Sequence, residues 1–291
     1  MVNLNRFIAV DWSARNQPSP KKPTKDAIWL AEATTTGPVT THYFRTRHAC
    51  HAYLQQRLIE LRDERTLVGW DFSFGYPRGF ADALGLSAIP AWRAVWDYLD
   101  RLVQDTDDNR SNRFLVGAHL NQQIGATAGP FWGVPAGQAS KYLHPTRDFH
   151  FPVGQLAERR YVETLRPRMQ PAWQLAYTGS VGSQSLLGIP YVRQLRDHTL
   201  LRDVSRVWPF ESLGAIAGAT VLHAEIYPSL LPLPRLDPIP DREQVRGYVE
   251  WLRQQQEADR LSALLDRPWG NDGERHRAVT AEEGWVLGLF C

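Results

Sequence analysis

Cysteine is almost absent from this chain of 291 residues, which contains only Cys50 and Cys291. Because Cys291 is the final residue and is poorly placed for a structural bridge, we expect no disulfide framework and infer a reducing, cytoplasmic compartment. The sequence has neither a Cys-x-x-Cys nor a His-Glu-x-x-His pattern. A structural zinc site is therefore not expected.

Long apolar runs and a strong net charge are missing as well. The first apolar run, residues 7–10, ends at Asp11, so it is too short for a signal peptide or a membrane-spanning helix. The formal net charge is only +2, which does not by itself indicate nucleic-acid binding. We expect a protein without a membrane segment, and its oligomeric state stays open.

The cations that are present are mostly arginine. Lysine occurs only at positions 21, 22, 25 and 141, whereas Lys and Arg together number 33. Arginine makes planar two-pronged contacts with phosphate, so this bias fits phosphate recognition, although a GC-rich genome produces the same bias. A hydrophobic content of 43% and a charged content of 22% are typical of a globular protein.

The N-terminal part of the chain predicts three strands, a helix and a fourth strand, because short apolar runs alternate with polar turns. The predicted strands span 6–14, 27–33, 38–45 and 66–72, and the predicted helix spans 48–62. The first three strands can form an antiparallel meander, and the helix can return the fourth strand beside the first by a right-handed crossover. Asp11 and Asp71 would then meet at one edge of the sheet.

The middle of the chain has weaker patterns. A helix is expected over 90–104 and another over 183–200, broken near Gly188 and Pro190. The stretch 105–155 is rich in Gly, Pro, Asn and Asp and has weak periodicity. We interpret residues 85–178 as an insertion within a single domain of residues 1–291, where the insertion forms one wall of a cleft.

A late strand and a late helix add two more acidic residues. Residues 220–226 read as a strand that contains Glu225 near its end. Asp241, with a glutamine three residues later, resembles the capping box that begins a helix. If this helix is continuous, Asp259 lies seven residues after the apolar Leu252 and projects from the same inward face.

These carboxylates together suggest a metal site. Several carboxylates at one sheet edge repel each other unless they share a cation, and Mg²⁺ and Mn²⁺ both prefer oxygen ligands. Two such ions about 4 Å apart can activate a water and stabilise the leaving oxygen in phosphodiester cleavage. The sequence therefore predicts a metal-dependent nuclease or phosphodiesterase using Mg²⁺ or Mn²⁺. The candidate catalytic residues are Asp11, Asp71, Glu225 and Asp259, of which Asp11, Asp71 and Asp259 are the candidate metal ligands.

Four segments, IAVDWSA, VGWDFSFGYP, AEIYPSL and EADRLSALL, resemble in this order the signature blocks of a family of predicted ribonuclease H-like nucleases of unknown function. The matching positions are Asp11, Asp71 with Gly75 and Pro77, Glu225 with Pro228, and Asp259 with Ala263 and Leu264. The resemblance implies an α/β fold with a ribonuclease H-like mixed sheet. Its first three strands would be antiparallel and its later strands parallel, flanked by helices and interrupted by a large central insertion.

Two departures from the family pattern keep other functions open. Ser229 and Ser262 stand near places where relatives often carry acidic residues, which puts a second metal site in doubt. A non-catalytic binding or partner protein on the same fold is one alternative. A nucleotide-binding phosphotransferase or ATPase is another, although residues 12–14 (WSA) replace the Gly-Thr phosphate turn expected there.

Each carboxylate also has a structural explanation. Asp11 and Asp71 could cap turns at strand ends, Glu225 could pair with an arginine such as Arg193, and Asp259 could be solvated if the helix breaks near Gln255. His223 would share a face with Glu225, either as a general base or as a buried structural histidine.

Four residues are candidates for substrate binding. Ser13 and Ser73 each follow a key aspartate by two residues, Tyr76 could stack on a base, and Arg113 could hold a phosphate. Core packing is the alternative for the aromatic residue and a solvated face for the arginine. The substrate would be nucleic acid or a small phosphoester, and the sequence does not distinguish DNA from RNA.

Overall fold

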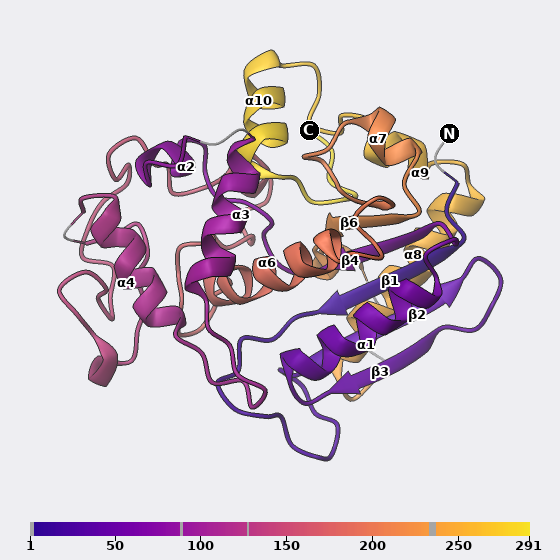
Figure 1. The fold of residues 1–291 in the computed structure, drawn as a ribbon, viewed down its shortest axis with the longest axis horizontal. Helices are drawn as coiled ribbons and strands as arrows, with labels where there is room; N and C mark the ends of the chain where they lie inside the picture. The colour runs from indigo at the N-terminus through magenta and orange to yellow at the C-terminus, as the bar shows by residue number, and fades with distance from the viewer. Residues whose placement is uncertain (1–2, 88–89, 127, 233–236) are drawn as a thin grey trace.

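A computed structural model describes residues 3–87, 90–126, 128–232 and 237–291, and these form an α/β fold around one mixed sheet (Figure 1). The strands are β1 (Arg6–Asp11), β2 (Ile28–Thr34), β3 (Thr40–Phe44), β4 (Thr66–Trp70), β5 (Ser205–Val207) and β6 (Val221–Glu225). The longer helices are α1 (Arg47–Glu60), α3 (Ala91–Leu102), α4 (Arg113–Gln123), α6 (Gly182–Asp197) and α8 (Pro240–Glu257). Short helices are α2 (Phe80–Ala83), η1 (Ala136–Gln138), α5 (Tyr161–Thr164), α7 (Leu213–Ala217), η2 (Pro228–Leu230), α9 (Leu261–Leu265), α10 (Gly273–Ala278) and η3 (Val279–Glu283).

The sheet has the strand order β3-β2-β1-β4-β6-β5. Strands β1, β2 and β3 form the antiparallel meander, and α1 returns β4 to lie parallel beside β1. Strand β6 is parallel to β4, and β5 is parallel to β6. The predicted mixed sheet, antiparallel first and parallel later, is therefore confirmed.

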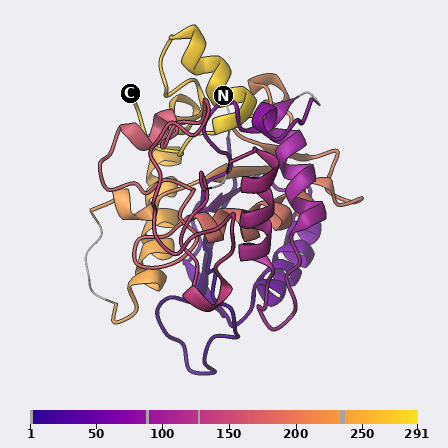
Figure 2. The same ribbon diagram turned by 90° about the vertical axis from the view of Figure 1, so that its left-hand side faces the viewer.

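Alternating side chains divide the sheet into two buried faces. Ile8 and Val10 belong to the apolar cluster that includes α1, α3 and α6, whereas Phe7 and Ala9 belong to the cluster that includes α8. Successive residues of a strand point to opposite faces, so this alternation follows from the pleat of β1. Helices consequently cover both faces of the sheet (Figure 2).

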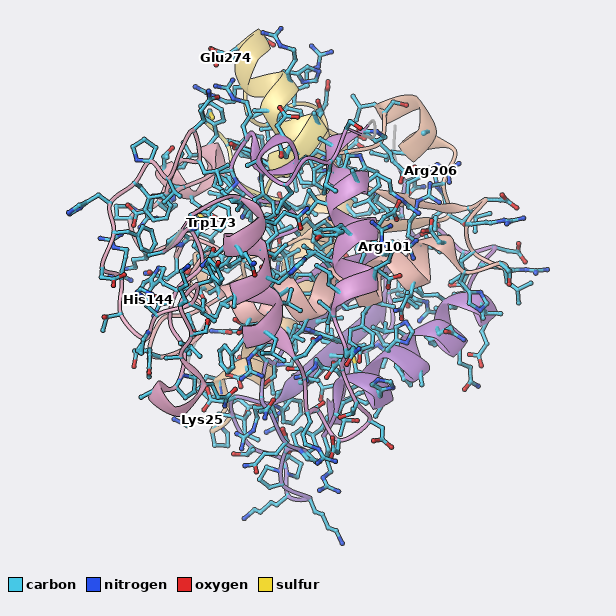
Figure 3. The ribbon with its side chains drawn as sticks, turned by 60° about the vertical axis from the view of Figure 1, so that its left-hand side comes forward. Lys25, Arg101, His144, Trp173, Arg206 and Glu274 are labelled. Atoms are coloured by element: carbon cyan, nitrogen blue, oxygen red, sulfur yellow. The ribbon has the colours of Figure 1, made fainter. Side chains whose placement is uncertain are left out.

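The segment predicted to be an insertion, residues 85–178, packs mostly against the first of these faces. Most of its buried apolar side chains, including Phe114, Phe131 and Trp173, join the same cluster as Ile8 and Val10, whereas Val162 and Met169 join the cluster that includes α8. Trp173, labelled in Figure 3, is completely buried. The expected helix over 90–104 is confirmed as α3. The stretch 105–155, predicted to have little regular structure, nevertheless contains α4.

Helix α6 runs without a break through Pro190, so the predicted interruption near Gly188 and Pro190 was wrong. A proline inside a helix removes one hydrogen bond, but most of α6 is buried, and its packing outweighs that loss. Gly188 permits this packing, because a Cβ atom there would lie 2.4 Å from the ring of Phe72.

Helix α8 crosses the second face from one end of the sheet to the other. Its first turn contacts residues near the end of β1, where the backbone N–H of Asp26 donates to the Asp241 carboxylate. Its last turn contacts the start of β1, where Gln256 accepts from the N–H of Leu4. Ile239 occupies the N-cap and Pro240 the first turn, so the predicted capping box at Asp241 was wrong.

No helix of the described residues is both long and apolar enough to cross a membrane.

Candidate functional site

Asp11 and Asp71 lie side by side at the ends of β1 and β4. Val10 is the register partner of Trp70, and the N–H of Asp71 donates to the carbonyl oxygen of Val10 at 2.9 Å. Strand alternation places both aspartates on the face that α8 covers, with Phe7 and Ala9 rather than with Ile8 and Val10. The predicted meeting of these two residues at one sheet edge is confirmed.

No protein group in the described part of the chain compensates either carboxylate. Among the residues that the structure describes, the side chains of Asp11 and Asp71 have no hydrogen bond or ion pair. Burial, followed by the negative charges of Asp71, Asp241 and Asp26, raises the pKa of Asp11 well above its usual value. Burial and the charges of Glu225 and Asp241 raise the pKa of Asp71 to about 7. The pair therefore favours a bound proton or cation.

Asp241 contributes a third carboxylate to this edge, from the first turn of α8. Its charge raises the pKa of both Asp11 and Asp71, and burial raises its own pKa. In the sequence, the position of Asp241 predicted only a helix cap. The acidic residues in the first turn of α8 could have indicated that Asp241 belongs to the site. Only the direction of α8 across the sheet, however, reveals that this end of the helix faces Asp11.

Asp259 lies away from this edge, so its predicted place on the inward face was wrong. Helix α8 ends at Glu257, and Asp259 adopts a left-handed backbone conformation with φ of 55° in the turn before α9. It is exposed to solvent. It follows the end of α8 that contacts Leu4, at the opposite end of β1 from Asp11. The structure therefore does not bring Asp259 to the other three predicted residues.

Glu225 is buried and forms an ion pair with an arginine. Its two oxygens accept hydrogen bonds from the two terminal nitrogens of Arg160 at 2.7 and 2.8 Å, and one also accepts from the N–H of Phe74 at 2.9 Å. Glu225 is the register partner of Trp70, so the two side chains point to the same face of the sheet. Asp71 follows Trp70 and therefore points to the opposite face. The alternative of an arginine pair is confirmed, but the partner is Arg160.

Arg193 instead pairs with Asp97 and Asp100.

His223 has a structural environment. The indole N–H of Trp70 donates to its Nδ1 at 3.2 Å, so the proton lies on Nε2, which faces the Ser205 hydroxyl at 3.1 Å. Burial, with a smaller contribution from the charge of Arg196, lowers the pKa of His223 to about 3. A histidine that is neutral and has both nitrogens engaged is a packing residue, which supports the structural explanation.

The two predicted serines hold the chain in place. Ser13 Oγ donates to the carbonyl oxygen of Asp26 at 3.1 Å, and Ser73 Oγ accepts from Arg160 at 2.9 Å. Tyr76 is 1% exposed and packs against Phe80, Phe131 and Trp173. Base stacking by Tyr76 was therefore a wrong prediction, because the ring is not accessible.

Arg113 retains free donor capacity close to the loop that follows Asp11. It donates to Asn16 at 3.0 Å and to Ser111 at 3.1 Å, and its guanidinium lies 4.5 Å from the ring centre of Phe114. Its buried Nε has no acceptor among the described residues. Burial and the charge of Arg47 lower the pKa of Arg113 to about 10, a value at which it is still cationic at neutral pH.

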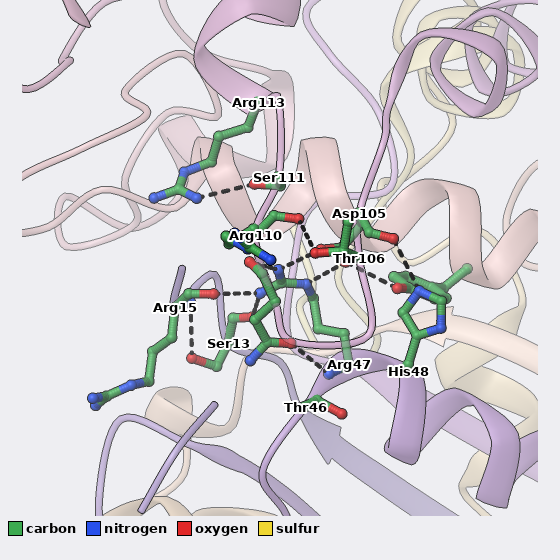
Figure 4. A network of polar contacts seen from close by, with 12 residues as sticks. Ser13, Arg15, Thr46, Arg47, His48, Asp105, Thr106, Arg110, Ser111 and Arg113 are labelled. Atoms are coloured by element: carbon green, nitrogen blue, oxygen red, sulfur yellow. Dashed lines mark hydrogen bonds and ion pairs between the residues drawn. The ribbon is translucent and has the colours of Figure 1, made fainter. Parts of the chain in front are cut away.

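Arg47 fixes this same loop in place (Figure 4). It is completely buried, forms an ion pair with Asp105, and donates to the carbonyl oxygens of Ser13 and Arg15 at 3.0 and 2.8 Å. The loop after Asp11 is thus attached to α1 and to the insertion. Nothing in the sequence pattern singled out Arg47, because its partners are distant in sequence.

A small cavity of about 100 Å³ opens beside Asp71 and is also lined by Ser73, Arg160, Glu225 and Tyr227. Across the described ranges, no group of three or more His, Cys, Asp or Glu side chains is placed to hold a metal ion. The unpaired Asp11 and Asp71 carboxylates fit Mg²⁺ or Mn²⁺, since Mg²⁺ commonly binds through one or two carboxylates and keeps several waters.

Comparison with known proteins finds no matching family model, no matching curated protein and no matching solved structure.

Proposed function

We propose that this protein is a divalent-metal-dependent phosphodiesterase with a ribonuclease H-like core. The observation that carries the proposal is the pair of unpaired, partly buried carboxylates, Asp11 and Asp71, at the ends of adjacent parallel strands. Unpaired carboxylates are costly to bury, so their side-by-side placement favours a bound cation. An antiparallel meander followed by parallel strands is also the sheet that the sequence resemblance implies.

Asp11 and Asp71 would hold the ion, and Asp241 would increase the negative charge that attracts it. When bound, Mg²⁺ or Mn²⁺ polarises a phosphoryl oxygen and lowers the pKa of a coordinated water. Arg113, whose guanidinium donates to Asn16 in the loop after Asp11, would contact a substrate phosphate. Arg47 keeps that loop in position.

The test is cleavage of single- and double-stranded DNA, RNA and bis(p-nitrophenyl) phosphate in the presence of Mn²⁺. We expect Asp71→Asn to reduce the rate by at least about 100-fold, because it removes a ligand of the only proposed ion. Asp259→Asn is the matched control, since it makes the same chemical change at an exposed position. Equal rates for wild type and Asp71→Asn would contradict the proposal.

A second candidate, a non-catalytic binding protein on the same fold, is favoured by one observation. Half of the predicted carboxylate set is not available for metal binding, because Glu225 is paired with Arg160 and Asp259 is remote. Failure of the wild type to bind any divalent cation would favour this candidate. No observation favours nucleotide phosphotransfer, and the cytoplasmic location remains a prediction from cysteine content.

A further inference from the structure

Arg160 lies at the centre of a buried ionic network next to the proposed metal site. It is 1% exposed and forms ion pairs with Glu225 and Glu163, each at 2.7 Å. It comes from the insertion, immediately before α5, while Glu225 ends β6 and Ser73 follows β4. The guanidinium therefore joins the ends of β4 and β6 to the segment before α5, beside Asp71.

Every N–H group of this guanidinium has an acceptor. Nε donates to Glu163, one terminal nitrogen donates to Glu225 and to the carbonyl oxygen of Glu283, and the other donates to Glu225 and to Ser73. An arginine has five such donors, so none is left for a substrate. Arg160 therefore acts through the groups that it holds and not through contact with a ligand.

The same network removes Glu225 from the set of metal ligands. Both of its oxygens accept from Arg160, and one also accepts from Phe74. In a two-metal site, a second ion about 4 Å from the first would lie close to Asp71 and would need a further carboxylate. The small cavity that Asp71 shares with Glu225 is the available space, and Arg160 lines it.

We infer that the site takes a single divalent cation, because the guanidinium of Arg160 holds both oxygens of Glu225, the carboxylate that a second ion would need. This inference rests on the proposed function. A second dication in the cavity would have to compete with Arg160 for the oxygens of Glu225, both of which are already hydrogen-bonded. The absence of an acidic side chain at Ser229 fits the same arrangement.

The test counts bound Mn²⁺ on the full-length protein by calorimetry and by electron paramagnetic resonance. We expect one Mn²⁺ per chain and a spectrum without magnetic coupling between neighbouring ions. Two ions with coupled spectra in the wild type would overturn the inference while leaving the metal site in place. No bound ion would overturn the proposed function together with the inference, so the two failures are distinguishable.

Two variants test the role of Arg160. Arg160→Met removes the charge and frees Glu225, so we expect the stoichiometry to rise from one Mn²⁺ to two. Arg160→Met combined with Glu225→Gln removes both charges and should again bind one. A folded Arg160→Met protein, verified by circular dichroism, that still binds one ion would contradict the inference. If Arg160→Met does not fold, the wild-type spectrum decides alone.

Discussion

Asp71 and Glu225 end neighbouring strands, yet their carboxylates meet opposite surroundings. Glu225 is ion-paired with Arg160 and accepts from a backbone N–H, whereas Asp71 has no such partner among the described residues. Asp71 and Glu225 cannot be distinguished in the sequence, because each is an acidic residue at the end of an apolar run. The difference comes from Arg160, which is 65 positions from Glu225, so local patterns could not separate the structural carboxylate from the functional one.

His223 makes the stability of the folded protein depend on pH. Its pKa of about 3 in the folded protein lies below the ordinary value near 6.5, so protonation favours the unfolded chain. The stability it contributes is present above about pH 6.5 and is lost as the pH falls toward 3, by up to about 1.4 kcal/mol per pH unit. Chemical denaturation between pH 7 and pH 5 measures this loss.

His223→Gln is expected to be less stable at pH 7 but to lose less stability on acidification, because glutamine does not titrate. The matched control is the exposed His150, changed to Gln. An identical pH dependence in the wild type and in His223→Gln would show that His223 is not the responsible group.

At the scale of elements, the short-range patterns were sufficient for most strands and for most of the longer helices. Strands β1, β2, β3 and β4 and helices α1 and α3 were predicted because each has a clear apolar period and polar ends. The errors came from tertiary contacts. Helix α6 continues through Pro190 because it is buried, and α8 ends before Asp259 because a left-handed turn follows it.

Helix α2 provides a prediction about a contact distant in sequence. The Glu282 carboxylate accepts from the N–H groups of Gly79 and Ala81 at 2.8 and 2.6 Å, at the start of α2. Glu282→Ala would leave these donors unpaired, which we expect to cost about 1–3 kcal/mol. Hydrogen exchange should also accelerate at these two amides.

The control is Glu257→Ala at the exposed end of α8. A loss of stability no larger than that of the control, with unchanged exchange at Gly79 and Ala81, would contradict the assigned role of Glu282.

On the scale of the whole molecule, the insertion and the sheet share one apolar cluster, so we expect them to unfold together. Arg47 strengthens this connection by joining α1, the loop after Asp11 and Asp105 of the insertion. Arg47→Met would leave Asp105 buried without its ion-pair partner and should cost about 3–5 kcal/mol. Urea denaturation followed by tryptophan fluorescence and by circular dichroism measures this cost.

Arg62→Met is the control, because the side chain of Arg62 is 52% exposed. Coincident transitions for both probes are expected. A separate early transition would show that the insertion unfolds on its own. The insertion was the least predictable part of the chain, since its stability depends on such distant contacts and not on local periodicity.

The central claim, that Asp11 and Asp71 are kept unpaired to bind a cation, is tested most directly by thermal unfolding at pH 8 with and without Mn²⁺. Without metal, Asp71→Asn should be more stable than the wild type, because it removes an uncompensated negative charge from a partly buried pair. With Mn²⁺ at about 100 times its dissociation constant, the wild type should gain about 2.7 kcal/mol and the variant should gain little. An unchanged unfolding temperature of the wild type in saturating Mn²⁺, or equal gains for both proteins, would contradict the claim.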